Sequence, residues 1–211
     1  MADKTNYVRG NAIFLYDSLQ RENTAEMIGD LAHMVNKMPF ASNYDYNTPI
    51  ESPYYLNTNT PVIDVFINSP GGKIYIMNTI MTFLNIARNK GAIIRTTVTG
   101  FAASCASMIA IQGTAGFRIM YDKAYNGIHY GNSDISVRAN GEIDLAANNE
   151  KKCRQIQKDI YKKFTNMTDT EINACMKVEH HVYSAKECLE KNICDWVLTD
   201  AGRFIQRNKQ R

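Results

Sequence analysis

Two residues of the sequence have the types and the setting that serine-type catalysis requires. Ser104 follows the apolar stretch "VTGFAA" and precedes "CASMIA", where a buried strand should end and a helix should begin. A serine hydroxyl becomes a nucleophile when a base takes its proton and backbone N–H groups stabilise the oxyanion. His129 in "YNGIHYG" follows the next predicted strand and is the candidate general base.

Each of these residues also has a structural interpretation. Small residues flank Ser104, as a tight turn requires, but alanines replace the glycines of the pattern G-x-S-x-G. Taken alone, Ser104 fits a small serine packed in a helix, and His129 fits a hydrogen-bonded histidine of the core. The chemical interpretation therefore depends on whether the fold brings the two residues to one place.

A third candidate is the turn Ser69-Pro70-Gly71-Gly72. Two glycines free the backbone to turn and to approach a ligand closely. Their N–H groups are able to donate to an oxyanion or to pair with an extended peptide. An ordinary strand-to-helix turn has the same composition.

The elements around these residues alternate between strand and helix patterns. A strand in "PVIDVFINSPGG" leads to a helix in "YIMNTIMTFLNIARNKG", which should stop at Gly91; the strand "AIIRTTVTG", the short helix "SCASMIAIQG" and the strand "FRIMY" follow. This order predicts a parallel sheet with crossover helices. Functional groups of such folds gather at the carboxyl ends of the strands, where both turns should lie.

The rest of the chain is consistent with one domain, 1–211. Residues 12–16 predict a strand, and a helix capped by Thr24 should follow. Residues 39–60 lack a period and indicate a surface insertion. Residues 140–165 predict a long polar helix with a narrow apolar stripe (Cys153, Ile156, Ile160 and Phe164), which suits a projecting element, a contact with a partner subunit or a surface helix on its own domain. "YSAKECLEKNICDWVL" predicts a short helix, a turn and the last strand.

Composition excludes several classes of protein. The chain has 211 residues, a net charge of +3 and 45% hydrophobic residues, enough for a real core and without the basic stripe that nucleic-acid binding needs. We find neither a secretory signal nor a membrane span, and the five scattered cysteines suit a reducing compartment, so we expect a cytoplasmic protein. No metal site is expected, because the adjacent His180 and His181 point apart and no Cys or carboxylate spacing supports zinc.

The motifs "FINSPGG", "GFAAS" and "IH" together resemble the proteolytic subunit of the Clp protease family, ClpP, whose members are serine peptidases. "NAIFLYDSLQRENTAEMIGDLAHM" and "SAKECLEKNICDWVL" resemble that family's opening and closing segments. The resemblance implies an α/β fold, a ClpP/crotonase-type spiral of repeated β-β-α units, with residues 140–165 as its projecting handle helix. The divergence and the insertion would suit a phage-borne relative.

Carried over by position, the resemblance implies a role for each candidate residue. Ser104 would be the nucleophile and His129 the general base. The backbone N–H groups of Cys105 and of Gly72 or Gly71 would form the oxyanion hole. The Gly71-Gly72 strand would also bind substrate as an added β-strand, recognising its backbone.

The third catalytic residue of the family, an aspartate, is missing. Its position is Met176 when counted back from the closing motif and Cys175 when counted forward from the long helix, and neither residue is acidic. Glu179 is the nearest carboxylate and Asp134 is the other candidate, although Glu179 fits a solvated surface charge slightly better than a catalytic role. A Ser–His dyad is the third alternative.

The resemblance implies an endopeptidase that cleaves unfolded polypeptides inside a chamber. The chamber would consist of heptameric rings stacked as a tetradecamer, served by an AAA+ unfoldase ATPase, since the chain has no phosphate-binding loop and needs no cofactor of its own. Two alternatives stay open. One is a catalytically inactive ring subunit, which the missing aspartate favours. The other is a crotonase-type acyl-CoA enzyme, which would rely on carboxylates rather than on Ser104.

Overall fold

A computed structural model describes residues 5–41, 52–54, 60–129, 142–177 and 181–206, with side chains from 148 onward in the fourth range. Most of the predicted insertion at 39–60 lies outside these ranges. Both candidate carboxylates, Asp134 and Glu179, also lie outside the described residues.

The described strands form one mixed, mostly parallel sheet. In spatial order, β1-β2-β3-β4-β5-β8-β9 make up its main path, while β6 extends from the end of β4 and pairs with β7. The pairs β1–β2, β6–β7 and β8–β9 are antiparallel, and the others are parallel. The strands are β1 (Asn6–Arg9), β2 (Ala12–Leu15), β3 (Val62–Ser69), β4 (Ile93–Ala103), β5 (Arg118–Tyr121), β6 (Tyr125–Ile128), β7 (His181–Ser184), β8 (Trp196–Leu198) and β9 (Phe204–Gln206).

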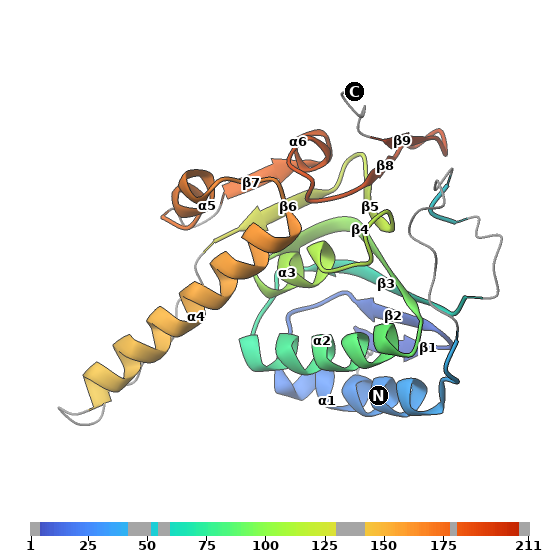
Figure 1. The fold of residues 1–211 in the computed structure, drawn as a ribbon, viewed down its shortest axis with the longest axis horizontal. Coiled ribbons are helices and arrows are strands. Elements are labelled where there is room, and N and C mark those ends of the chain that lie inside the picture. The colour runs from blue at the N-terminus through green and yellow to red at the C-terminus, as the bar shows by residue number, and fades with distance from the viewer. Residues whose placement is uncertain (1–4, 42–51, 55–59, 130–141, 178–180, 207–211) are drawn as a thin grey trace.

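Helices connect the parallel strands in chain order (Figure 1). Successive crossovers advance along the sheet in one direction, from β2 to β5, and α1 contacts α2, which contacts α3. The mixed α/β architecture with a mainly parallel sheet is therefore confirmed. The helices are α1 (Arg21–Lys37), α2 (Ile74–Asn89), α3 (Cys105–Ile111), α4 (Glu142–Phe164), α5 (Asp169–Cys175) and α6 (Ala185–Glu190).

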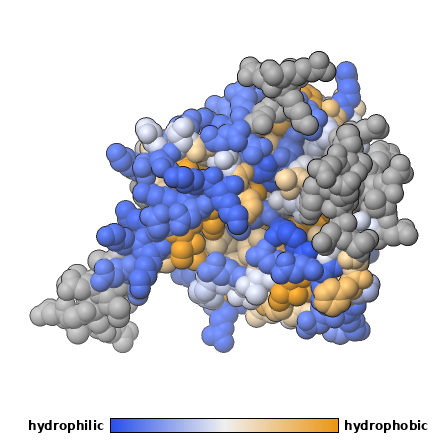
Figure 2. All heavy atoms as spheres, viewed as in Figure 1, coloured by the Kyte–Doolittle hydropathy of each residue, from blue (hydrophilic) through white to orange (hydrophobic). Residues whose placement is uncertain are grey.

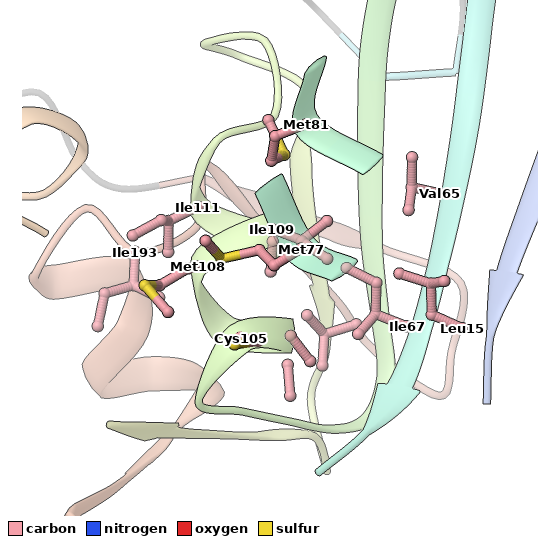
Figure 3. Close-up of a cluster of buried hydrophobic side chains, with 14 of the residues drawn as sticks. Leu15, Val65, Ile67, Met77, Met81, Cys105, Met108, Ile109, Ile111 and Ile193 are labelled. Carbon is pink, nitrogen blue, oxygen red and sulfur yellow. The ribbon is translucent and has the colours of Figure 1, made fainter. Parts of the chain in front are cut away.

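The core lies between the sheet and these helices. Every second residue of β3 is buried, including Val65 and Ile67, which belong to one core cluster with Met77 of α2 and Ile109 of α3 (Figure 3). All seven residues of α3 are buried. Because α3 touches little solvent, packing on every side fixes the position of the residue that precedes it.

Two local predictions differ from the structure. Helix α1 begins after Gln20 rather than after Thr24, because Gln20 and Asn23 form a reciprocal capping box one turn earlier. Thr24 lies inside the first turn, and its hydroxyl donates to the Gln20 carbonyl at 2.5 Å. The strand β8 is also not the last, since β9 returns antiparallel beside it. By contrast, Gly91 follows α2 at φ 93°, the left-handed conformation expected of a C-terminal stop.

Helix α4 projects from the body of the molecule (Figure 1). Its predicted apolar stripe is not its buried face. Ile156 is 44% exposed, whereas Gln157 and Tyr161, at 4% and 1%, are buried. Ile160 and Phe164 are partly buried against the core. None of the helices in the described part of the chain is long and apolar enough to cross a membrane.

A buried ion pair ties the ends of several elements together. The guanidinium of Arg118 on β5 donates to Asp195 at 2.6 Å, and also to the carbonyls of Ile111, Phe164 and Asn192. These carbonyls close α3, α4 and the turn after α6. The charge of Arg118, 4% exposed, is therefore both paired and fully hydrogen-bonded.

Candidate active site

Ser104 occupies a strained turn between β4 and α3. It is the N-cap of α3 and has φ 54° and ψ −125°, in the region of positive φ that L-residues rarely adopt. In the described residues only one other non-glycine residue, Asn192, has positive φ. Ser104 is 9% exposed. Backbone strain of this kind persists where surrounding contacts hold it, and such residues cluster at functional sites.

Strand β6 holds the Ser104 turn from one side. The Ser104 N–H donates to the Gly127 carbonyl at 3.0 Å, extending the parallel pairing in which Ala103 lies opposite Gly127. A Cβ at Gly127 would lie 3.0 Å from the Ala103 Cβ. The absence of a side chain at Gly127 is what lets the two strands approach this closely.

The glycine turn touches Ser104 from the other side. Gly71 has φ 92°, and a Cβ placed on it would lie 2.8 Å from the Ser104 Cβ and 2.9 Å from the Cys105 nitrogen. Only glycine fits at this contact. The structure thus brings together two motifs that the sequence separates by more than thirty residues.

The neighbouring Gly72 is held along both of its edges. On one edge Leu19 donates its N–H to the Gly71 carbonyl at 2.6 Å and accepts the Lys73 N–H at 2.9 Å. On the other edge the Gly72 carbonyl accepts the Cys105 thiol at 3.0 Å. The N–H and C=O of one extended residue point to the same side, so the Gly72 N–H faces the Ser104 turn.

Cys105 is a buried donor and not a second nucleophile. It is 1% exposed, and burial raises the pKa of its thiol to about 11. The thiol is therefore protonated at neutral pH, which suits its hydrogen bond to Gly72 and suppresses thiolate chemistry.

Strand register places His129 at the same edge of the sheet as Ser104. β4 and β6 are parallel, with Ala102 opposite Asn126 and Ala103 opposite Gly127. Continuing this register sets Ser104 beside Ile128, one residue before His129. The His129 side chain is partly buried. The fold therefore assembles Ser104, His129 and both glycines at one edge, as the sequence predicts for strand ends.

The two positions at which the resemblance would place the family aspartate hold neutral, buried side chains. Cys175 and Met176 end α5, and each is 2% exposed. The Cys175 sulfur and the Tyr183 hydroxyl lie 2.9 Å apart, and burial raises the pKa of both groups. This location therefore supplies a thiol–phenol contact rather than a carboxylate.

Sequence reasoning missed two residues that shape the site. The Ser69 hydroxyl donates to the Asp17 carbonyl at 2.6 Å and accepts the Gly71 N–H at 3.1 Å. Asn68 Oδ1 accepts the Phe101 N–H at 3.0 Å, which ties the glycine turn to the Ser104 strand. Both residues belong to the quoted motif "INSPGG", so the signal was present, but it was attributed to the glycines alone.

The described side chains form no cluster of three or more His, Cys, Asp or Glu groups suited to a metal ion. All five cysteines are free thiols. The residues that the strand register brings to this edge supply a hydroxyl, an imidazole and backbone N–H donors, which are the groups that acyl transfer through a nucleophile uses.

These features define an α/β protein in which one sheet edge carries a strained serine, a two-glycine turn and a histidine. The family model described as Clp protease matches residues 42–201, which is most of the chain. The chain therefore belongs to the Clp protease family.

Among curated relatives, the ATP-dependent Clp protease proteolytic subunit 3 of Frankia casuarinae is 27% identical over 136 residues. The matched region covers 64% of this chain and 62% of that protein, so the chain spans about three fifths of the length of that relative. The recognition of the family from its three motifs is confirmed at this distance.

Proposed function

We propose that this protein is a serine endopeptidase that cleaves unfolded polypeptides through an acyl-enzyme on Ser104. His129 takes the Ser104 proton during attack on the scissile carbonyl and returns it to the leaving amine. Water then hydrolyses the ester with His129 acting again as base. The fold family makes a spiral of β-β-α units the expected architecture around this site.

The observation that carries the proposal is the backbone of Ser104. A positive φ at the junction of β4 and a fully buried helix projects the hydroxyl at the strand end, as a nucleophile turn requires. A packing serine has no need of this conformation, which costs about 1–3 kcal/mol. Its strain therefore favours a chemical role over a structural one.

Hydrogen bonds around the glycine turn favour Gly72 over Gly71 as an oxyanion donor. The Gly71 N–H is already donated to the Ser69 hydroxyl. The Gly72 N–H faces the Ser104 turn, and the N–H of Cys105 opens α3 beside it. Together they form a donor pair of the type that stabilises tetrahedral intermediates. The same extended segment is suited to bind substrate by strand addition.

We infer further that the subunit works in stacked heptameric rings, a tetradecamer, in the cytoplasm with an AAA+ unfoldase ATPase. Family membership and the projecting α4 support this assembly. Enclosure of the Ser104 edge in a chamber would restrict cleavage to unfolded chains.

One observation favours a second candidate, a catalytically inactive ring subunit. Cys175 and Met176 replace the expected carboxylate with neutral buried groups. Activity would then require Glu179, Asp134 or a Ser–His dyad. The site does not support the acyl-CoA alternative, because the candidate groups in this protein are a hydroxyl and an imidazole, whereas such an enzyme would rely on carboxylates.

A fluorophosphonate probe separates these functions. Intact mass spectrometry should find one adduct per subunit on the wild-type protein and none on Ser104→Ala or His129→Ala. Glu179→Gln and Asp134→Asn, tested in parallel, identify the group that orients His129 by a rate loss of roughly tenfold to a thousandfold.

Assembly is the control for this experiment. Wild-type protein that forms rings but takes up no probe would contradict the peptidase and support the inactive subunit. An adduct that persists in Ser104→Ala would show that another residue reacts and would also overturn the proposal.

A further inference from the structure

Three buried polar side chains form a hydrogen-bonded chain behind the Ser104 turn. The Tyr161 hydroxyl of α4 donates to the Ser107 hydroxyl of α3 at 3.0 Å, and Ser107 donates to Asn126 Oδ1 of β6 at 2.8 Å. Tyr161 is 1% exposed, and Ser107 and Asn126 are both 0% exposed. Burial raises the pKa of the Tyr161 hydroxyl, which keeps it a donor. We call these three residues the Tyr161 chain.

The Tyr161 chain joins the two elements that carry the candidate dyad. Ser107 lies one helical turn after Ser104 on α3. Asn126 lies on β6, three residues before His129 and next to Gly127, whose carbonyl accepts the Ser104 N–H. A hydrogen bond between Ser107 and Asn126 therefore fixes α3 against β6 directly behind the site.

The third member brings in the projecting helix. Of the α4 side chains from residue 148 to the end of the helix, only Gln157 and Tyr161 are buried. The phenol of Tyr161 therefore anchors α4 to α3 through a polar contact within an otherwise apolar core.

Stability alone does not explain this arrangement. Within the described part of the chain, the fully buried amide nitrogen of Asn126, Nδ2, has no hydrogen-bond partner. An unpaired buried donor is destabilising, but the Asn126 oxygen supplies the acceptor that the buried Ser107 hydroxyl would lack beside an apolar side chain. Asn126 therefore holds Ser107 in place and leaves one of its own donors unpaired.

We propose that Tyr161, Ser107 and Asn126 are positioning residues that set the placement of Ser104 relative to His129. The proposal rests on the proposed function. The chain acts through the backbone: Ser107 orients α3 and its N-cap serine, and Asn126 orients the strand that ends at His129. Shifts of about 1 Å in such an arrangement are enough to slow a reaction a hundredfold.

The test uses Tyr161→Phe, Asn126→Val and the double variant. Each single variant should react with the fluorophosphonate probe about tenfold more slowly, and the pH midpoint of that reaction should shift. The double variant should be no slower than the slower single variant, because the residues act as one unit. The melting temperature of Asn126→Val should stay close to that of the wild type, since the variant removes the unpaired Asn126 donor but leaves the buried Ser107 hydroxyl without its acceptor.

Thr114→Val is the matched control. It removes another buried hydroxyl, one that accepts the Ile94 N–H at 2.9 Å and lies beyond the C-terminal end of α3, whereas Ser104 precedes the N-terminal end. We expect it to lower the melting temperature without slowing the probe. Slow reaction in Thr114→Val as well, or wild-type rates and pH midpoints in both chain variants, would overturn the proposal.

Hydrogen–deuterium exchange separates this proposal from the proposed function. Tyr161→Phe should raise exchange in residues 101–112 and 125–129, while Thr114→Val should leave residues 125–129 unchanged. If the wild type takes up no probe, the peptidase proposal fails, and this exchange pattern still supports the positioning role. Unchanged exchange in both segments overturns it independently of activity.

Discussion

At the scale of single residues, the site is built from contacts that tolerate little variation. Gly71 lies so close to the Ser104 turn that no Cβ fits there, and a Cβ at Gly127 would lie only 3.0 Å from that of Ala103. Ser104 itself takes a conformation that a glycine would adopt more easily. Serine at this position lowers the stability of the fold, which is expected where the hydroxyl is needed for function.

This strain predicts that Ser104→Gly is more stable than Ser104→Ala. Both variants lack the hydroxyl and should be unreactive, but only glycine adopts φ 54° without steric strain. We expect the free energy of unfolding to be about 1 kcal/mol higher for Ser104→Gly than for Ser104→Ala. This difference already includes the larger loss of backbone entropy on folding that glycine causes. Urea denaturation of the two variants measures the difference. Equal midpoints would show that Ser104 is not strained.

At the scale of elements, the ends of short helices are held by capping boxes and charges. Thr168 caps α5, and Glu171 completes the box while pairing with Lys191 at 2.6 Å. The hydrogen bond from Lys191, followed by those from Thr168, lowers the pKa of the Glu171 carboxyl from 4.5 to about 2. The pair fixes α5, whose last residue is Cys175, against the turn after α6.

Stability should therefore depend on Glu171 in a defined pH range. A lowered pKa means that the carboxylate stabilises the fold fully above pH 4.5 and progressively less as pH falls towards about 2. Both side chains are partly exposed, so screening limits the contribution to about 0.5 kcal/mol. Glu171→Gln should lower the free energy of unfolding by this amount at pH 7.

Measurements at pH 7 and pH 2.5 test the sign. The difference between wild type and Glu171→Gln should shrink at the lower pH. Glu190→Gln, which removes the same charge from an exposed position of α6, is the control. A difference that grows on acidification would contradict the assignment.

At the scale of the whole molecule, α4 presents a mainly hydrophilic surface away from the body (Figure 2). Ile156 interrupts that surface and is 44% exposed. A half-exposed isoleucine on a projecting helix contributes little to the folding of its own subunit. It is suited to contact a second copy in the assembly that we propose.

Ile156→Glu should therefore weaken assembly and leave the subunit folded. Mass photometry should show a shift from the largest wild-type assembly to a smaller one, with an unchanged circular dichroism spectrum. Gln155→Glu adds the same charge at the adjacent exposed position and should assemble normally. Equal assembly of both variants would remove Ile156 from the contact.

The sequence by itself determined the order of the elements and the location of the candidate site. Alternating strand and helix patterns require a mainly parallel sheet, and parallel strands bring their carboxyl ends to one edge. The motifs at Gly71, Ser104 and His129 follow three of these strands, so their proximity follows from local patterns.

Only the tertiary structure decided which side chains meet across the core. The Tyr161–Ser107 hydrogen bond joins residues 54 positions apart, and no hydrophobic period marks a polar pair of this kind. The buried face of α4 could not be predicted from the sequence either, because its two buried side chains, Gln157 and Tyr161, lie beside the apolar stripe and carry polar groups. A polar group is buried only where distant elements supply its hydrogen-bond partners, and a local sequence pattern does not identify those partners.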